Sequence, residues 1–376
     1  MSAKKIPVCG ELFESMGSVA VKATRLQGGV RDGVLVVDLI AGDTRVVLLP
    51  DRGLGIWKIF SGDLELGWRS PIRGPVHPRF VPLGEPSGNG WLEGFDELLA
   101  RCGLVSNGEP DFADNGRLLH GLHGRIANQP AQDVTVTLDD TAGTVSLSGN
   151  VDETRFLAHS LRMTTKLTVH GDRRRVSWTD EVENLSECAT TMQMLYHVNF
   201  GPPLLGAGTE FLADVEELAP CNLAAVADLP TWQRYAAPQS GRGAQVHFMK
   251  LRPSNAGRAS ALIVGPDGKN AARLSWRAAE LPCFTLWKNQ GGLADGYVTG
   301  LEPGTNYPNP RSFEESQGRV VRLAPRSRVS FDLAIEHLPE PEIIAVRACL
   351  TAGNRPYVNT QPRSGWSMPQ QRVVST

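Results

Sequence analysis

The chain has 376 residues, a length that suits either two ordinary domains or one large β domain. Its 38 basic and 40 acidic residues leave a formal net charge of -2, so no whole-molecule field would attract nucleic acid or an anionic membrane. There is no apolar run long enough for a signal-peptide core or a membrane span, so the sequence predicts a soluble cytoplasmic protein with small-molecule partners. The sequence is also compatible with a homo-oligomer and does not determine the oligomeric state.

The cysteines show no framework that would imply disulfides or a metal. They are scattered without a CxxC pair or any metal-like spacing, which is typical of small buried hydrophobes or incidental thiols. No disulfide framework, zinc site or cofactor is therefore expected. The six positions are Cys9, Cys102, Cys188, Cys221, Cys283 and Cys349.

Period-two alternation rich in Val, Thr and Ile runs through most of the chain and predicts an all-β protein. Turn signals such as the Pro-Asp-Gly at 266–268 separate the strands, and a large antiparallel sandwich explains this spacing better than βαβ units. One domain is expected over 1–338, with its core at about 35–338. The clearest strand segments are 33–42, 44–50, 132–140, 143–151, 161–171, 174–184, 244–251, 260–276 and 327–338.

Few segments carry helix signals. The best is 94–104, where Phe95, Leu98, Leu99 and Cys102 fall at helical spacing and Gly103 would stop the helix. A weaker signal covers 341–353, inside a Pro-, Arg- and Ser-rich C-terminal tail at 339–376 that is expected to be extended or weakly helical.

The first candidate for chemistry along the chain is the segment HGLHGR at 120–125. Its glycines let the backbone bend, so that a ligand could approach His120, His123 and Arg125 closely. Two histidines three apart could also begin a metal site, but no third ligand stands at a matching short spacing.

Downstream, a strand rich in Met and Leu presents His197 and Asn199 on one face, two residues apart. Such a pair can point into a shared pocket. The alternative is a buried histidine whose ring is satisfied by the asparagine or by a backbone carbonyl.

Glu302 is the most informative residue, because it opens the Glu-Pro-Gly at 302–304 inside an otherwise apolar strand. Proline and glycine fix the backbone there, so the carboxylate can be aimed. The alternative is a rim carboxylate bonded to a nearby backbone amide. Together with the histidines, Glu302 suggests an acid/base pair acting on a neutral, hydroxyl-rich substrate.

Sugar sites combine bidentate polar side chains with aromatic platforms, so several cationic and aromatic residues are further candidates. The arginines could also serve a phosphate or carboxylate on the sugar, or form rim salt bridges. These candidates are Arg52, Trp68, Arg69, Trp91, Arg101, Trp287 and Lys288.

The segments HGLHGR, YHVNFG (196–201) and GLEPGTNYP (300–308) resemble, in order and wording, the HGG-type, NHxYFNL-like and LEPQNYP-like segments of the aldose 1-epimerase (galactose mutarotase-like) family. The resemblance spans roughly residues 35–338. The chain looks like a divergent branch of the family, in which the HGG doublet has become HGLHGR. It implies a large antiparallel β supersandwich with a sugar bound in a groove across one sheet.

The resemblance also implies roles. Glu302 would be the general base at the anomeric hydroxyl, His197 the general acid at the ring oxygen, and His123 the assisting histidine, with His120 as the alternative for that position. Arg101 most resembles the family's arginine, with Arg52 as the alternative, and the family's substrate-binding aspartate has no identified counterpart. The implied activity is cofactor-independent interconversion of sugar anomers, with the carboxylate beside an imidazolium expected to have a lowered pKa.

Three rival functions remain at this point. A sandwich-fold carbohydrate hydrolase or lyase could pair Glu302 with Glu93 or Asp96. A carbohydrate-binding or sensing module would keep the groove without turnover. A metal-assisted keto-sugar epimerase would use His120 and His123.

Overall fold

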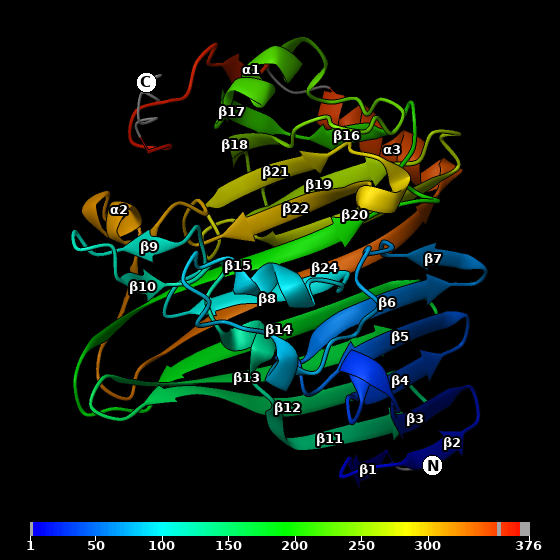
Figure 1. Ribbon diagram of the computed structural model, residues 1–376. Helices are drawn as coiled ribbons and strands as arrows, with labels where there is room; N and C mark the ends of the chain where they lie inside the picture. Colours follow the sequence, from blue (N-terminus) through cyan, green and yellow to red (C-terminus); the bar gives the residue numbers. More distant parts are fainter. Residues whose placement is uncertain (1–2, 352–354, 369–376) are drawn as a thin grey trace.

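The computed structural model describes residues 3–351 and 355–368. Within these residues the chain is built almost entirely of antiparallel strands, arranged as two large sheets that face each other (Figure 1). None of the described helices combines the length and the apolar character needed to cross a membrane.

In the described residues, the first sheet has nine strands. In spatial order they are β1 (Lys4–Pro7), β11 (Ala131–Asp139), β12 (Thr144–Arg155), β13 (His159–His170), β14 (Arg175–Asn184), β24 (Arg328–Pro339), β20 (Asn270–Arg277), β19 (Arg258–Val264) and β16 (Glu210–Ala213).

The second sheet carries the cavity described below. Its main path is β2 (Leu12–Met16), β3 (Val19–Arg25), β4 (Leu35–Ala41), β5 (Thr44–Leu49), β6 (Gly55–Ser61), β8 (Leu99–Leu104), β15 (Thr190–Phe200), β22 (Val298–Gly304), β21 (Cys283–Asn289), β18 (Gln245–Leu251), β17 (Val215–Pro220) and β25 (Tyr357–Val358). Off this path, β7 (Leu64–Leu66) pairs with β6, and β23 (Val321–Leu323) pairs with β15.

The remaining elements are small. A two-stranded ribbon is formed by β9 (Asp111–Phe112) and β10 (Leu118–His120), and the α-helices are α1 (Leu223–Asp228), α2 (Arg311–Ser316) and α3 (Glu340–Thr351). Single turns of 3-10 helix lie at Gly29–Arg31, Pro78–Phe80, Gly90–Gly94, Ile126–Asn128, Leu229–Thr231 and Leu293–Asp295.

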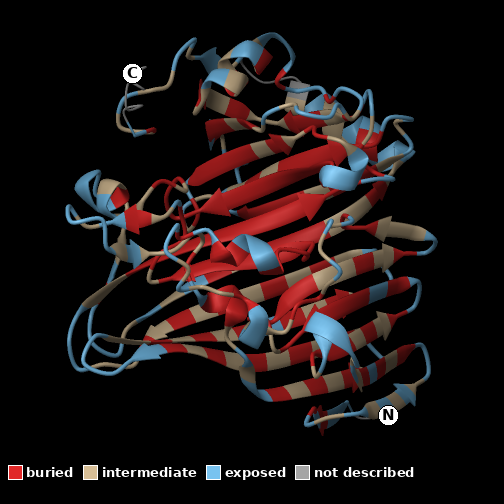
Figure 2. Cartoon of the chain, viewed as in Figure 1, coloured by how far each residue is buried: buried red, intermediate tan, exposed pale blue. Residues whose placement is uncertain are grey.

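The period-two alternation of the sequence corresponds to the alternating side-chain directions of the pleated strands. In β12 and β14 every second residue is buried against the opposite sheet and the residues between them are half-buried, which appears as red and tan stripes in Figure 2. The centre of the second sheet differs, because β15 and β22 are buried on both faces. Loops cover the outer face there, and the cavity lies beneath them.

The helix predicted over 94–104 is wrong. The structure has a 3-10 turn at Gly90–Gly94 and then strand β8, which pairs with β15 from Val198↔Leu99 to Gln193↔Leu104. All six residues of β8 are buried, so apolar residues occur on both faces of the strand and their spacing also fits a helix. Pairing with β15 and β6 supplies the backbone hydrogen bonds.

The C-terminal segment folds back onto the sandwich. Helix α3 coincides with the weaker helix signal, while 352 and 353 of that signal lie outside the described residues. After it, β25 pairs in parallel with β17, and the Trp366 ring packs on Tyr307 with centroids 5.0 Å apart. The segment therefore forms part of the outer wall over the second sheet.

Candidate functional site

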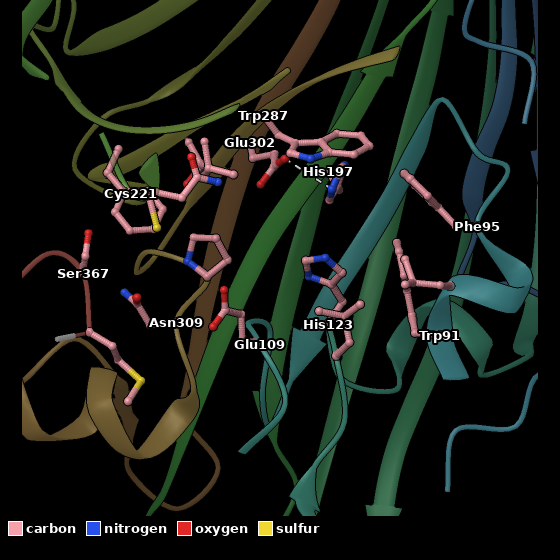
Figure 3. Close-up of a pocket in the computed structure, with 18 residues that line it drawn as sticks. Trp91, Phe95, Glu109, His123, His197, Cys221, Trp287, Glu302, Asn309 and Ser367 are labelled. Atoms are coloured by element: carbon pink, nitrogen blue, oxygen red, sulfur yellow. Dashed lines mark ion pairs between the residues drawn. The ribbon is translucent and has the colours of Figure 1, made fainter. Parts of the chain in front are cut away.

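A cavity of about 510 Å³ lies on the outer face of the second sheet, over β15, β22, β21 and β18 (Figure 3). This volume is within the range of small-molecule sites. Its lining is mainly apolar and aromatic, with a few polar groups. The lining residues are Trp91, Leu92, Phe95, Glu109, Leu122, His123, His197, Cys221, Asn222, Val246, Phe248, Thr285, Trp287, Glu302, Pro308, Asn309, Ser367 and Met368.

Strand register brings the acid/base candidates together. Strand β22 lies between β15 and β21, with Val198 opposite Leu301 and Thr285 opposite Glu302. Because the strands are antiparallel, His197 is the neighbour of Glu302 on β15. Both side chains point to the loop-covered face of the sheet, about a hundred residues apart in sequence but adjacent in space.

The His197 Nε2 atom lies 3.2 Å from Oε1 of Glu302, and both residues are buried. The contact is close, but Glu302 Oε1 has no hydrogen bond of good geometry to another described protein atom. Glu302 also lines the cavity, so its carboxyl group can meet a ligand there. A neighbouring glycine makes room for the pair, since a Cβ on Gly300 would stand 2.5 Å from Glu302 Oε1 and 3.0 Å from His197 Cε1.

Asn199 fixes the ring of His197. The Asn199 amide nitrogen donates to the carbonyls of Glu97 and His197, at 3.1 and 3.0 Å, so its Oδ1 is the atom that faces the imidazole. His197 Nδ1 lies 2.7 Å from this oxygen and must be the donor. The Nε2 atom is thus left to exchange a proton with Glu302, and Asn199 has a positioning role instead of lining the cavity.

Burial governs the protonation of the pair. It raises the pKa of Glu302 to about 8 and holds the pKa of His197 well below its usual value, with the nearby His123 acting in the same direction on His197. The expectation that attraction between opposite charges would lower the carboxylate pKa is wrong, because the loss of solvent outweighs it. At neutral pH the favoured form is a carboxylic acid beside a neutral imidazole, with one mobile proton between them.

His123 stands beside this pair on the wall of the cavity. Its Nδ1 lies 2.9 Å from the carbonyl oxygen of Asn107, to which it donates, so Nε2 is the free atom. The rings of His123 and His197 are 5.2 Å apart, and Trp91 lies 4.6 Å from His123. Burial lowers the pKa of His123 to about 4, so its ring is neutral near pH 7.

Aromatic rings enclose the same end of the cavity. Phe95 and Trp287 meet the His197 ring at centroid distances of 5.1 and 5.5 Å. Figure 3 shows Trp287 above the pair and Phe95 and Trp91 to one side. Such flat apolar surfaces suit the C–H faces of a sugar ring.

The opposite end of the cavity contains polar residues that the sequence did not single out. Glu109, Asn309 and Ser367 stand there (Figure 3). They come from the loop after β8, the loop after β22 and the C-terminal segment. Loop residues carry no periodic signal, and only the spatial path of each loop reveals that they meet.

The cationic candidates do not line this cavity. Arg101 pairs with Asp180 between the two sheets, and Lys288 donates to Asp228 at 2.6 Å. Arg52 is buried in an ion pair with Glu97 and is further bonded to Asn128. Each of these side chains forms an ion pair with a buried carboxylate. The expectation that they contact a substrate in this cavity is therefore wrong.

Trp68 and Arg69 also lie away from the cavity. The Trp68 indole donates to the carbonyl of Glu97 at 3.0 Å and its ring supports Phe95 from behind. Arg69 is exposed in a separate surface depression that Trp68 also lines. Trp68 therefore supports the cavity wall without forming it.

His120 and Arg125 line a different cavity, on the other side of the 120–125 loop from His123. They therefore do not join the His197 and Glu302 pair. Over 3–351 and 355–368, no group of three or more His, Cys, Asp or Glu side chains is arranged to hold a metal ion.

The carboxylates considered for a hydrolase are placed elsewhere too. Glu93 is exposed and does not line the cavity. Asp96 accepts a hydrogen bond from the Trp57 indole at 3.0 Å and lines the depression that contains Arg69. Neither can pair with Glu302 across the cavity.

Fold and site together define a galactose mutarotase-like β-sandwich protein. A solved structure from Klebsiella pneumoniae subsp. pneumoniae, described as a "putative aldose 1-epimerase", is 30% identical, with a TM-score of 0.92 over 96% of this chain and 100% of that one. A galactose mutarotase-like protein from Clostridium acetobutylicum is 14% identical (TM-score 0.59, covering 86% of this chain and 99% of that one). Galactose 1-epimerase from Lactobacillus acidophilus NCFM is 10% identical (TM-score 0.56, with the same two shares).

Residues 31–337 match the family model described as "Domain of unknown function (DUF4432)", so the chain belongs to that family. No curated protein matches the chain. The two more distant structures support the fold alone. The resemblance to the aldose 1-epimerase family and the β-sandwich fold class, both expected from the sequence, are confirmed.

Proposed function

We propose that this protein is an aldose 1-epimerase that interconverts the anomers of a monosaccharide by acid/base ring opening, without a covalent intermediate. The observation that carries the proposal is the contact of 3.2 Å between His197 Nε2 and Glu302 Oε1 at the floor of an aromatic cavity. Opening a hemiacetal requires one group to take the O1 proton while another gives a proton to O5. A buried pair that shares one mobile proton is suited to both transfers.

The proton balance is simple. In the reactive form the mobile proton is on His197 Nε2 and Glu302 is ionised. Glu302 takes the proton of O1, His197 gives its proton to O5, and the C1–O5 bond breaks to leave an aldehyde. The pair is then neutral, which is the form that burial favours. After rotation about C1–C2, both transfers reverse and the ring closes.

A bound sugar would also promote the reactive form. The O1 hydroxyl can donate to the Glu302 carboxylate, which lines the cavity, and a hydrogen bond to the charged form lowers the pKa of a carboxyl group. His123 Nε2 lies free on the cavity wall near the His197 ring, where it can bond a ring hydroxyl. The substrate thus supplies hydrogen bonds to Glu302 and His123.

Anomer exchange measured by exchange NMR and polarimetry tests the proposal. We expect Glu302→Gln and His197→Ala each to lower the catalysed rate by about 100-fold or more, the usual contribution of general acid/base groups. Glu187→Gln, at an exposed position, and His170→Ala, on the other sheet, are matched controls that should retain activity. Retained exchange in both site variants would refute the proposal.

Gly300→Ala probes the geometry without removing either group. The added methyl would overlap Glu302 Oε1 and press on His197, so exchange should fall strongly while both side chains remain present. Gly243→Ala is the matched control, since a Cβ there meets nothing within 4 Å. Wild-type exchange by the Gly300→Ala variant would show that the observed pair geometry is not required.

A further inference from the structure

The cavity has two chemically different ends. One contains His197 and Glu302, and the other contains Glu109, Asn309 and Ser367, all drawn in Figure 3. Figure 3 shows Glu109 across the cavity from Glu302, with its carboxylate turned inward. A ligand whose reacting carbon lies at the first end would extend its remaining substituents towards the second.

The exposed carboxylate of Glu109 lines the cavity without a partner among the described residues. The side chain makes no ion pair or hydrogen bond with the rest of the described chain, although its backbone N–H donates to the Pro308 carbonyl at 2.9 Å. Gly108 allows that close approach, because a Cβ there would stand 2.0 Å from the Asn309 carbonyl oxygen. The loop is held tightly, while the carboxylate is on an exposed side chain at the rim of the cavity and is left for a ligand.

The neighbouring polar atoms are mostly hydrogen-bond acceptors. The Asn309 amide nitrogen donates to Glu314 at 2.6 Å and to the Trp366 carbonyl at 2.8 Å, which leaves its Oδ1 without a partner among the described residues. The buried Ser367 hydroxyl, near the Cys221 thiol, has no nitrogen or oxygen partner among the described residues. An acceptor-rich end requires hydrogen-bond donors on the ligand, and sugar hydroxyls are donors.

Charge at the cavity points to the same ligand class. In the part of the chain that the structure describes, no lysine or arginine lines the cavity, whereas Glu109 and Glu302 both do. An anionic substituent would lose its hydration, find no cation to replace it and face carboxylates. The cationic candidates that could have bound a phosphate either form buried ion pairs or lie away from this cavity, as described above.

On the basis of the proposed function, we propose that Glu109 is a substrate-binding residue that accepts hydrogen bonds from hydroxyls remote from the anomeric carbon. It thereby restricts the substrate to aldoses without a phosphate, sulfonate or carboxylate group. Asn309 and Ser367 complete this end of the site. Glu109 takes no part in the proton transfers.

Steady-state exchange kinetics of the full chain with neutral aldoses, a hexose 6-phosphate and a uronic acid test this inference. We expect the wild type to accelerate exchange of one or more neutral aldoses and of neither anion. Glu109→Gln should raise KM by about 10-fold or more while kcat changes by less than about threefold, since a charged hydrogen bond made equally in the ground and transition states is lost. Asp114→Asn, at an exposed turn position, should behave like wild type.

The outcomes separate this inference from the proposed function. Equal acceleration of phosphorylated and neutral sugars, or an unchanged KM in Glu109→Gln with an unchanged thermal unfolding midpoint, would overturn the inference alone. Cleavage of an aryl glycoside that requires Glu109 would show it to be catalytic and also overturn the inference. If no aldose is turned over, the proposed function fails. The inference would still be supported if saturation-transfer NMR shows that neutral sugars bind and that Glu109→Gln weakens this binding. If neutral sugars do not bind, the inference is overturned as well.

Discussion

The buried position of Glu302 couples its ionisation to the stability of the fold. Its pKa is raised from 4.5 to about 8 by burial, so the folded chain holds this proton more tightly than the unfolded chain. The stabilisation that this provides is fully present below about pH 4.5 and is lost progressively as the pH rises to about 8. Above that pH the folded chain carries an unfavourable buried charge.

We therefore expect Glu302→Gln to make the protein more stable at alkaline pH, although it removes the proposed base. The free energy of unfolding should exceed that of the wild type by on the order of a few kcal/mol at pH 8.5, because glutamine cannot ionise. At pH 4.5 the difference should be small. Urea denaturation at both pH values measures this, and an equal difference at both would mean that Glu302 ionisation is not responsible.

Strand parity explains which candidate residues the sequence could place. Glu302, His197 and His123 were selected from motif wording, and the register brings the first two together. Arg101 is a candidate from the family resemblance and Lys288 from its charge, but each follows a residue of the opposite face. Adjacent residues in a strand point to opposite sides, so Arg101 next to Ala100, and Lys288 next to Trp287, point away from the cavity. The sequence contains this parity, but only the pairing shows which face carries the site.

At the scale of elements, the second sheet shows where local patterns are sufficient and where they are not. Strands with one buried face, such as β12, are readily predicted from alternation. Strand β8 is buried on both faces and its apolar spacing also fits a helix, so only its tertiary pairing with β15 decides its conformation. The cavity wall formed by the C-terminal segment could not be predicted, because its contacts with β17 and Tyr307 join residues distant in sequence.

Trp366 anchors that C-terminal wall and provides a test of its contribution. The ring packs on Tyr307 and under the Arg363 guanidinium, and its carbonyl accepts the Asn309 amide, so Ser367 and Met368 are held at the cavity. Trp366→Ala should raise KM for the sugar by about threefold to tenfold with little change in kcat. The reason is that loss of the ring contact with Tyr307 would loosen the part of the cavity wall that carries Ser367 and Met368.

Hydrogen exchange should also become faster over 355–368 in the Trp366→Ala variant. Tyr357→Ala is a suitable control, because that ring is exposed on the same segment. A loss of kcat with KM unchanged would instead connect this segment to the chemistry of His197 and Glu302.

At the scale of the whole molecule, a buried ion pair joins the two sheets directly beneath the site. Arg101 on β8 donates from Nε and Nη2 to the two oxygens of Asp180 on β14, at 2.7 and 3.1 Å. The guanidinium also donates to the Leu54 carbonyl, and the Thr165 hydroxyl donates to Asp180. Every strong partner of Arg101 is thus inside the sandwich, which makes its contribution structural.

Arg101→Ala should therefore lower the free energy of unfolding by about 3–5 kcal/mol, because Asp180 would be left as an uncompensated buried charge. Replacing both partners with apolar residues, as in Arg101→Met with Asp180→Leu, should recover much of this loss, and denaturant titrations of the three proteins measure it. Exchange activity per folded molecule should remain near wild type, since Ala100 and not Arg101 shares the face of His197. A variant with wild-type stability but impaired sugar binding would instead place Arg101 in the substrate site, and would require the register of β8 to differ from that observed.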